Sequence, residues 1–305
     1  MIRYHFGFDD PSGTARRGKR LRPQLLLRVA LAEGGAVESA LGAAVAIEVL
    51  HNYSLVHDDI EDGDELRHGR PALWTRYGIA QGINAGDAMC ALSYLALLDC
   101  EAGSPPERLA RMARALHEAN LGMCEGQGLD IAFEGRDAVS LDEYRAMVFG
   151  KTAALFGASC ELGALSARAS DARAAAYARM GRAYGVAFQV RDDVLGTWGS
   201  SAATGKPSGG DIARRKWTFP VVWALGQPAC ADRQIVAVAY GRRRRLDSAE
   251  SLEVVAALER LGARAAADDA GDTALGEADR IAGEFDLDRE RSIRDFLAQG
   301  ARRVA

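Results

Sequence analysis

The sequence predicts an all-α protein, and three observations support this prediction. The 305 residues are 48% hydrophobic but only 7% aromatic, with eight prolines, and alanine, leucine, arginine and glutamate dominate. Few stretches show the alternation of β-branched and polar residues that is typical of strands. Long segments instead repeat apolar residues at helical spacing. No stretch of disordered composition divides the chain, so we expect one domain over residues 1–305.

Charge and targeting signals narrow the class of protein. The net charge of −4 indicates neither nucleic acid nor an anionic membrane surface as a partner. The N-terminal segment lacks an apolar run of signal-peptide length, and no window approaches the ~20 apolar residues of a membrane span. We therefore expect a cytoplasmic protein without a transmembrane segment. Its five cysteines form no C-x-x-C pair and are expected to be reduced core residues: Cys90, Cys100, Cys124, Cys160 and Cys230.

A basic cluster opens the chain, with five cations in the seven residues from Arg16 to Arg22. Pro23 follows directly, and proline favours the first turn of a helix, so the cluster is expected where a buried helix begins. Such clusters most often decorate a solvated surface. Backbone donors and guanidinium groups at a helix start also suit a phosphate, and both interpretations stay open here.

The run Asp58-Asp59-Ile60-Glu61-Asp62 follows the mostly apolar stretch 45–50. In a helix, Asp58 and Asp62 lie one above the other, since residues four apart share a face. Like charges in this position repel each other unless a cation lies between them. Mg²⁺ takes one or two carboxylates when a phosphate supplies further ligands, although an isolated acidic patch is more often only surface.

The glycine- and proline-containing stretch 63–74 predicts a loop. It carries Arg67 and Arg70, and Arg67 could simply neutralise Asp62 or Asp64. The nearly all-apolar segment 82–98 predicts a buried helix. Asp87 near its start is then a charge favoured by the helix dipole.

The middle of the chain places polar groups among predicted helices. An amphipathic pattern covers residues 107–123, and beyond it Gln127 and Asp130 share a helix face. Ser140 and Glu143 have the spacing of a capping box. Lys151 lies in an apolar run, so its side chain either extends to the surface or points into a cavity.

A second acidic pair, Asp192-Asp193, ends the helical pattern that begins at residue 177. The polar loop 197–210 follows, and Lys206 and Lys216 flank it, so this pair also has cations nearby. The helices around 250–265 and 273–303 are expected to be structural, and the four arginines 242–245 between helices are expected to be solvated.

Each of the two carboxylate pairs has arginine or lysine side chains nearby. Divalent metal ions bound together with a polyanion would neutralise all of these charges. Magnesium bound to a diphosphate satisfies the acids, while arginines and lysines take the remaining phosphate oxygens. Apolar helices around such a site would enclose a hydrocarbon. The sequence therefore predicts an amphiphilic substrate with a diphosphate head and an apolar tail.

These motifs resemble the trans-isoprenyl diphosphate synthases, or polyprenyl synthetases, in the same order from Gly18 to about Leu225. Gly18-Lys19-Arg20-Leu21-Arg22-Pro23 is similar to the family's basic motif, and the 58–62 run matches its D-D-x-x-D motif. The resemblance implies that Lys19, Arg22 and His51 bind isopentenyl diphosphate. It also implies catalytic or substrate-binding roles for residues that match its later motifs: Arg67, Gln127, Asp130, Lys151, Thr152, Gln189, Asp192, Asp193, Lys206, Asp211 and Lys216.

The resemblance implies a homodimer in which each subunit is a bundle of about a dozen helices around a central cavity. Three Mg²⁺ ions, with Asp58, Asp62 and Asp192 as ligands, would activate an allylic diphosphate. Isopentenyl diphosphate would then attack the allylic cation in a head-to-tail (1'-4) condensation, and the released diphosphate would take the last proton. The implied enzyme is a prenyltransferase of isoprenoid biosynthesis.

Three positions depart from the family pattern. His68 stands where the family usually has a second arginine that binds isopentenyl diphosphate, unless Arg70 substitutes for it. Gly196 replaces the third acid of the second motif, so Asp192 is expected to bind metal with Asp193 and water. Only 17 residues precede Gly18, which would shorten the first helix.

Product length depends on the residues beneath the first motif. Tyr53 lies five residues before Asp58, or about 7.5 Å deeper along a helix, where an aromatic ring blocks the growing tail in this family. With small Ser54 beside it, Tyr53 predicts a short product, geranylgeranyl rather than farnesyl diphosphate. A buried tyrosine often merely packs with its hydroxyl on a partner, and that alternative stays open.

Two further alternatives concern the reaction. A class I terpene cyclase shares the fold, but its metal triad of Asn, Ser and Glu is replaced here by Asp192-Asp193. An inactive regulatory subunit of a synthase would explain His68 and Gly196.

Overall fold

The computed structural model describes residues 1–10, 18–100, 105–199, 209–287 and 292–302. The described residues are almost entirely helical, with one short two-stranded hairpin, which confirms the predicted all-α class. The chain forms two compact units, called unit 1 (Met1–His117 with Ala158–Tyr177) and unit 2 (Glu118–Gly157 with Ala178–Ala305). The single domain expected over residues 1–305 stays a prediction.

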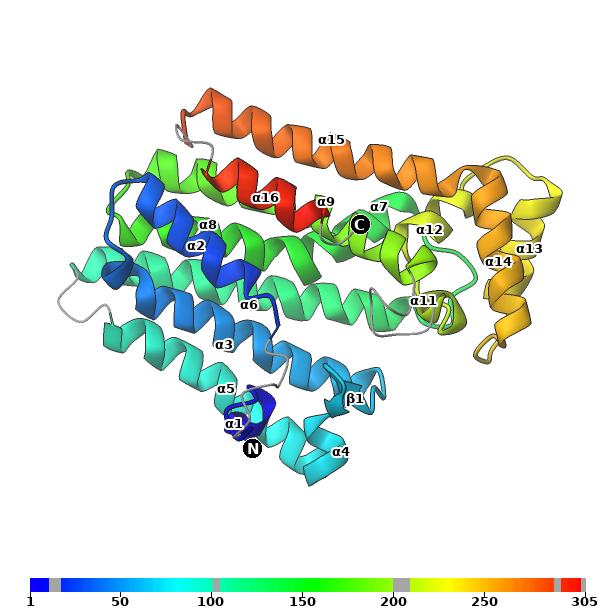
Figure 1. Ribbon diagram of the computed structural model, residues 1–305, viewed down its shortest axis with the longest axis horizontal. Coiled ribbons are helices and arrows are strands. Elements are labelled where there is room, and N and C mark those ends of the chain that lie inside the picture. Colours follow the sequence, from blue (N-terminus) through cyan, green and yellow to red (C-terminus); the bar gives the residue numbers. More distant parts are fainter. Residues whose placement is uncertain (11–17, 101–104, 200–208, 288–291, 303–305) are drawn as a thin grey trace. The chain divides into compact units, whose positions relative to one another are not determined.

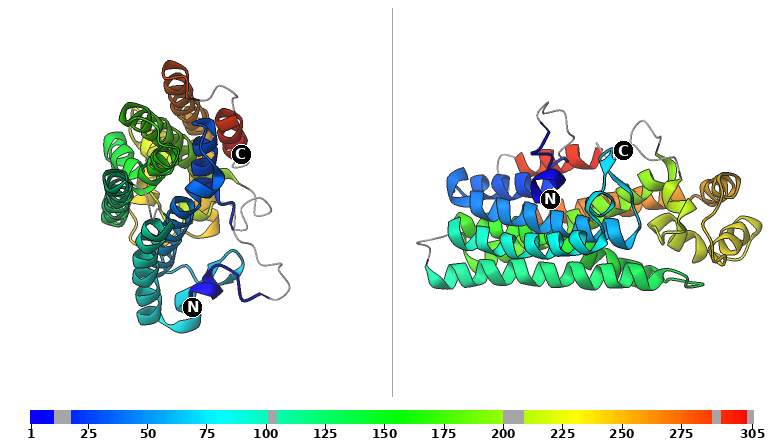
Figure 2. Two further views of the ribbon diagram at one scale, coloured as in Figure 1. Left: turned by 90° about the vertical axis from the view of Figure 1, so that its left-hand side faces the viewer. Right: turned by 90° about the horizontal axis from the view of Figure 1, so that it is seen from below.

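Unit 1 contains α1 (Ile2–His5), α2 (Leu21–Ala32), α3 (Val37–Glu61), β1 (Leu66–Arg67), β2 (Arg70–Pro71), α4 (Leu73–Tyr77) and α5 (Ile79–Cys100). Helices α6 (Pro106–Phe133), α8 (Ala154–Ser166) and α9 (Asp171–Trp198) contribute residues to both units. Within unit 1, α3 packs against α2 on one side and α5 on the other, as the blue and cyan ribbons show (Figures 1 and 2).

Helix α3 is the core of unit 1, and its sequence explains why. Buried residues recur every three or four positions, at Ala40, Ala43, Ile47, Leu50 and Tyr53. By length and hydropathy alone α3 could cross a membrane, whereas no segment was expected from the sequence to meet this criterion. Half of that apolar window is buried inside the protein, as in the core helix of a globular domain.

A glycine allows close packing between α8 and α2 in unit 1. A Cβ added at Gly163 would lie 2.4 Å from the Leu26 carbonyl oxygen, a distance that no side chain could occupy. The helix that carries Arg22 is therefore held backbone to backbone against its neighbour.

Unit 2 completes the chain with α7 (Leu141–Val148), the π-helix η1 (Phe149–Ala153), α11 (Gly210–Ala213), α12 (Phe219–Leu225), α13 (Ala231–Tyr240), α14 (Ser248–Leu261), α15 (Ala263–Glu284) and α16 (Ser292–Arg302). The capping box predicted at Ser140 and Glu143 is confirmed at the start of α7. Gly262, with φ of 82°, separates α14 from α15, so the break comes earlier than the sequence analysis expected.

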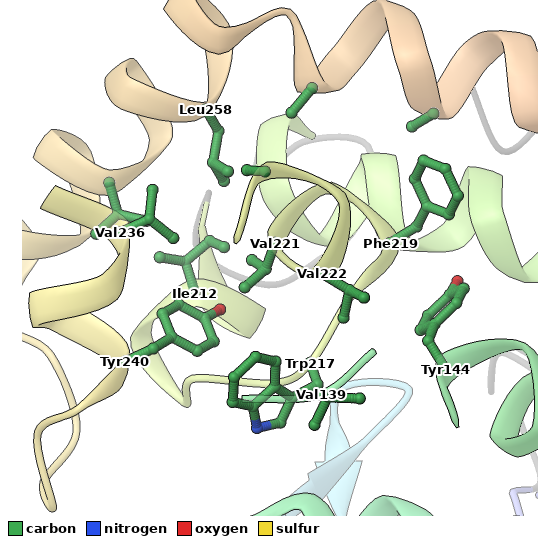
Figure 3. Packing of buried hydrophobic residues seen from close by; sticks show 14 of the residues in the cluster. Val139, Tyr144, Ile212, Trp217, Phe219, Val221, Val222, Val236, Tyr240 and Leu258 are labelled. Carbon is green, nitrogen blue, oxygen red and sulfur yellow. The ribbon is translucent and has the colours of Figure 1, made fainter. Parts of the chain in front are cut away.

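The core of unit 2 is a cluster of buried side chains from α7, α11, α12, α13 and α14 (Figure 3). Trp217 lies edge-on to Tyr240 with ring centroids 5.3 Å apart, and Tyr144 packs on Phe219 in the same way. Ile212, which is fully buried, fixes α11 to this cluster.

Helix α5 departs from the sequence-based expectation in two ways. It begins at Ile79 rather than near Gly82, so Asp87 lies well inside it and the predicted dipole role is wrong. The helix was also expected to be buried throughout. Its apolar side chains are buried on the side that faces α3, but Leu92, Leu95 and Leu98 are exposed.

Candidate active site

The first acidic motif ends helix α3. Asp62 is its C-cap residue, and the Asp62 N–H donates to the Asp58 carbonyl oxygen at 2.8 Å, so the two acids are one turn apart as predicted. Both residues are half-buried. Their carboxylate oxygens are the hard ligands that Mg²⁺ prefers.

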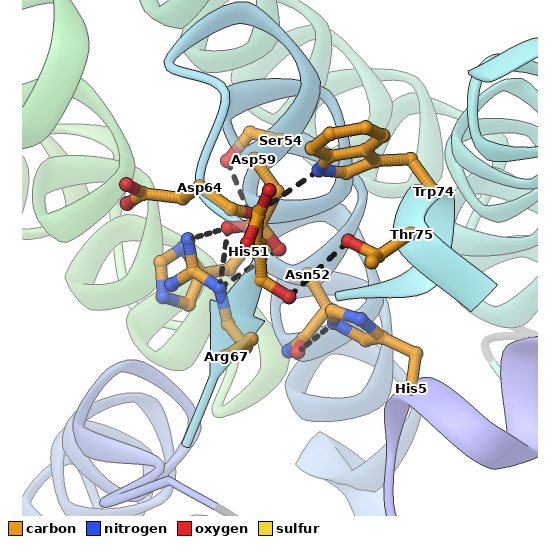
Figure 4. A network of polar contacts seen from close by, with 10 residues as sticks. His5, His51, Asn52, Ser54, Asp59, Asp64, Arg67, Trp74 and Thr75 are labelled. Carbon is orange, nitrogen blue, oxygen red and sulfur yellow. Dashed lines mark hydrogen bonds and ion pairs between the residues drawn. The ribbon is translucent and has the colours of Figure 1, made fainter. Parts of the chain in front are cut away.

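The middle acid of the motif has a different role. Asp59 is only 1% exposed, and Arg67 from β1 donates to it through Nε at 2.9 Å and Nη2 at 2.5 Å (Figure 4). Burial opposes the charge on Arg67, but its hydrogen bonds and ion pair with Asp59 raise the pKa of the guanidinium. The ion pair that the sequence left open for Arg67 is therefore made with Asp59. This neutralises one of the three aspartates of the motif.

The predicted loop after the motif is a tight hairpin of β1 and β2. His68 and Gly69, its two turn residues, have φ of 54° and 81°, as a type I′ turn requires. Arg70 donates to Asp9 at 3.0 Å and lies 4.3 Å above the Tyr4 ring. Arg70 therefore ties α1 to the hairpin, which argues against it as a substitute for the arginine missing at position 68.

Arg22 and His51 form a contact between α2 and α3. Arg22 Nη1 donates to His51 Nε2 at 3.1 Å. Burial, together with the charges of Arg22 and Arg67, holds the pKa of His51 well below its usual range. Because a guanidinium only donates, neutral His51 must carry its proton on Nδ1. Two predicted diphosphate ligands thus lie side by side, with His51 orienting the guanidinium.

The N-terminal helix adds a polar contact that the sequence analysis missed. His5 Nε2 donates to Asn52 Oδ1 at 3.0 Å, and burial lowers the pKa of His5 to about 4. Figure 4 shows this pair, and Asn52 in turn donates to the Glu48 carbonyl oxygen at 2.8 Å. His5 and Asn52 are 47 positions apart in the sequence, so no local spacing signal could have revealed this pair.

Tyr53 and His57 lie beneath the acids of α3. Tyr53 is 7% exposed, and its ring meets that of His57 edge-on at 5.6 Å. The His57 ring fits over Gly86 of α5, where an added Cβ would lie 2.2 Å from Nε2. Ser54 donates to the His51 carbonyl oxygen at 2.9 Å. Glycine at position 86 thus makes room for the ring that supports Tyr53.

In unit 2, Lys151 lies in the π-helix η1 and donates to Asp130 of α6 at 2.5 Å. The lysine side chain is therefore half-buried against a carboxylate, and its pointing into a cavity stays a prediction. The approach depends on glycine, because a Cβ added at Gly126 would lie 2.1 Å from the Lys151 backbone nitrogen. π-Helical turns of this kind recur at functional sites.

A hydrogen-bonded chain joins Thr152 to the second acidic motif. Thr152 donates to Gln189 Oε1 at 2.6 Å, and Gln189 Nε2 donates to Asp193 Oδ1 at 2.8 Å. Asp193 Oδ2 also accepts from the Tyr144 hydroxyl at 2.6 Å and the Phe219 N–H at 2.8 Å.

Asp193 is therefore enclosed by three hydrogen-bond donors of its own unit. It is only 5% exposed, and burial, opposed by its three donors, raises its pKa to about 7. Metal binding by Asp193 together with Asp192 stays a prediction, although both oxygens of Asp193 already accept hydrogen bonds. Its partners Tyr144 and Phe219 lie 49 and 26 residues away, which is why the sequence did not reveal them.

The remaining predicted residues are placed as follows. Asp192 is exposed on α9, while Lys19 is exposed at the start of α2 and Lys216 is half-buried after α11. Gln127 lies on α6, one turn from Asp130. Lys206 lies outside the described residues.

The donor set fits magnesium bound together with a phosphate. Within the described ranges, no three His, Cys, Asp or Glu side chains gather closely enough to hold a metal ion alone. Mg²⁺ commonly uses one or two carboxylates and takes its other ligands from phosphate and water. Asp58 and Asp62, at the end of α3, meet that requirement.

Comparison with known proteins identifies the family. The model of the family described as polyprenyl synthetase matches residues 12–258. The chain belongs to the polyprenyl synthetase family. The resemblance drawn from the motifs is therefore confirmed.

Curated relatives support the short-chain type within this family. The (2E,6E)-farnesyl diphosphate synthase of Mycobacterium tuberculosis H37Rv is 43% identical over 240 residues, covering 78% of this chain and 66% of the relative. The geranylgeranyl diphosphate synthase of the same organism is 42% identical over 242 residues, covering 78% and 68%. The chain thus spans about two thirds of the length of these relatives. Both product lengths weighed from the sequence occur among them.

Solved structures agree with the assignment. A polyprenyl synthetase from Streptomyces coelicolor A3(2) has a TM-score of 0.90 at 34% identity, and the match covers 100% of this chain and 90% of that one. Similarity in fold therefore extends over the whole chain, including the residues after 258 that the family model does not match.

Proposed function

We propose that this chain is a prenyltransferase that condenses isopentenyl diphosphate with an allylic diphosphate, giving a short all-trans prenyl diphosphate. One observation carries the proposal. Asp58 and Asp62 lie one turn apart at the end of α3, as carboxylates that share a metal-diphosphate cluster would, and Arg22 and His51 form a contact on α2 and α3 that suits an anion. Family membership and the names of the relatives support it.

Magnesium is the proposed cofactor, with three ions per active site. Asp58, Asp62 and Asp192 are the proposed ligands. When bound, Mg²⁺ supplies positive charge that stabilises the departing diphosphate. Asp59 does not bind metal in this proposal, because its carboxylate is occupied by Arg67.

The cationic side chains divide between the two substrates. Lys19, Arg22 and His51 bind isopentenyl diphosphate in this proposal. His51 is neutral, so it donates its Nδ1 proton or orients Arg22 rather than adding charge.

The allylic diphosphate is proposed to contact a larger set of residues. These are Arg67, Lys151, Thr152, Gln189, Lys206 and Lys216. Lys151 lies against Asp130, which holds its ammonium group in place and lowers the cost of ordering it on binding. Thr152 and Gln189 are ordered in the same way by the chain of hydrogen bonds that leads to Asp193.

Geranylgeranyl diphosphate is the proposed product, with farnesyl diphosphate as the alternative. Tyr53 supports a short product because its ring is buried and braced by His57, so it cannot easily swing aside. An inactive regulatory subunit is the second candidate function. Position 68 carries histidine instead of the family's arginine, and Arg70 contacts Asp9 and Tyr4 and so does not replace that arginine.

A prenyl transfer assay tests the proposal. Purified protein is incubated with Mg²⁺, isopentenyl diphosphate and each of the C5, C10 and C15 allylic diphosphates, and dephosphorylated products are sized by mass spectrometry. We expect products of up to twenty carbons. Absence of any longer product with all three primers would contradict the proposal and favour the regulatory subunit, and a cyclised hydrocarbon would indicate a cyclase.

The substitution Asp58→Ala tests whether turnover depends on the proposed metal ligand. It should abolish turnover while circular dichroism shows an unchanged helical signal, because Asp58 is only half-buried near the end of α3. Retained turnover would remove Asp58 from the proposed metal site.

We further propose a cytoplasmic homodimer. The exposed side chains Leu92, Leu95 and Leu98 on α5 support a second copy as the occupant of this face. Three exposed leucines at helical spacing form an apolar patch that water solvates poorly.

A further inference from the structure

The missing third acid of the second motif is replaced in space. Gly196 lies one turn after Asp192 on α9, at the position where the family's motif would place that acid. A Cβ added at Gly196 would lie 1.8 Å from Asp211 Oδ2 and 2.7 Å from its Cγ. The Asp211 carboxylate therefore occupies the space that a side chain at position 196 would need.

Asp211 is held in this position from several sides. It lies in α11, whose next residue, Ile212, is fully buried in the core cluster of unit 2 (Figure 3). The Lys216 N–H donates to the Asp211 carbonyl oxygen at 2.9 Å. Arg214 Nη2 donates to the carboxylate oxygen Oδ1 at 3.1 Å, so the other oxygen, Oδ2, is the one directed at Gly196.

The geometry restores the spacing of the acidic motif. Residues four apart lie one above the other on a helix, so the carboxylate over Gly196 stands one turn along from Asp192 on the same face. Asp193 cannot take this place because its carboxylate is buried and accepts from Gln189, Tyr144 and Phe219. A metal-binding carboxylate is commonly fixed by a hydrogen bond from behind, as Arg214 fixes Asp211.

We propose that Asp211 supplies the missing acid of the second metal site and binds Mg²⁺ together with Asp192. The inference rests on the proposed function, which implies a divalent cation at Asp192. Glycine at position 196 is then a requirement of this site rather than a loss. Helix α11 provides the acid that α9 lacks.

Metal binding without turnover tests this inference. Mn²⁺ is titrated into the full-length protein with inorganic pyrophosphate, and free Mn²⁺ is followed by electron paramagnetic resonance. Asp211→Asn keeps the shape of the side chain but removes its charge, and we expect at least about tenfold weaker Mn²⁺ binding. Asp268→Asn, which neutralises an exposed acid of α15, is the control and should bind as the wild type does.

A swap of the acid separates metal binding from a structural role. The double variant Gly196→Asp with Asp211→Ala moves the carboxylate onto α9 and removes the group that a new Cβ would meet. We expect it to regain most of the Mn²⁺ affinity. Gly196→Asp alone should lower Tm, because its Cβ would meet the Asp211 carboxylate.

The outcomes are distinguishable. Unchanged Mn²⁺ binding in Asp211→Asn, or a swap variant that is folded by circular dichroism but binds as weakly as Asp211→Asn, would overturn the inference and leave Asp211 as a partner of Arg214 only. Wild-type protein that binds no Mn²⁺ in the presence of pyrophosphate would overturn the proposed function and this inference together.

Discussion

Tyr53 is where a single side chain is expected to set the length of the product. Its ring is buried one and a half turns before Asp58 and is braced by His57. Tyr53→Ala should lengthen the main product by at least one isoprene unit, because removing the ring leaves room that an apolar tail can fill. Mass spectrometry of dephosphorylated products measures this.

Tyr53→Phe is the control for that experiment, since it keeps the ring and removes only the hydroxyl. It should leave product length unchanged. An unchanged distribution in Tyr53→Ala would show instead that Tyr53 only packs within unit 1.

His5 gives a pH dependence with a definite sign. Burial lowers its pKa from 6.5 to about 4, so between these values the unfolded chain binds the proton more tightly than the folded one. The contribution of neutral His5 to the free energy of unfolding is therefore complete above pH 6.5. This free energy falls by about 2 to 3 kcal/mol as the pH drops toward 4. His5→Gln keeps a donor for Asn52 but does not titrate, so its Tm should fall less over this range.

Tm measured at steps from pH 7 to pH 4 checks this prediction. Parallel curves for wild type and His5→Gln would contradict it. The pKa of His51 is lowered in the same direction, mainly by burial, and His51 titrates in both proteins.

At the scale of an element, the contact between α6 and η1 depends on the absence of a side chain. Gly126→Ala would place a Cβ 2.1 Å from the Lys151 backbone nitrogen, and backbone cannot move aside cheaply. We expect a loss of about 1 to 3 kcal/mol in the free energy of unfolding, measured by urea titration, and a lower turnover as Lys151 shifts.

Gly128→Ala is the matched control on the same helix. A Cβ there would meet nothing within 4 Å, so alanine should stabilise α6 by up to about 1 kcal/mol. Equal effects of the two substitutions would show that helix propensity, rather than the close crossing, decides stability here.

The sequence predicted the features that depend on residues close together along the chain. The capping box at Ser140 and the one-turn spacing of Asp58 and Asp62 are local, and both are present. The hairpin at residues 66–71 was predicted only as a loop, because strands of two residues carry no alternating pattern.

Long-range contacts lay beyond prediction from the sequence. The partners of Asp193 and the Asp211 carboxylate over Gly196 arise only once α9, α11 and α12 are packed. The exposure of one face of α5 was missed for the same reason. An all-apolar helix predicts burial, but the sequence does not indicate which part of the protein would cover each face.

At the scale of the whole molecule, that face predicts self-association. Leu95 is 52% exposed on α5, and Leu95→Glu would place a charge in an apolar interface. The variant should shift the protein from dimer to monomer in size-exclusion chromatography with light scattering, with a dissociation constant raised at least about tenfold. Leu252→Glu, at a leucine of α14 that is 68% exposed, should leave the mass unchanged. A monomeric wild type would contradict the proposed dimer.

The turn at His68 links backbone conformation to the charge available at this position. Its φ of 54° is uncommon for residues other than glycine, and histidine adopts it more readily than most. An arginine at this position would carry a permanent charge and a greater conformational penalty. Histidine at this turn therefore combines a lower conformational cost with a charge that depends on pH, whereas arginine would supply a constant charge.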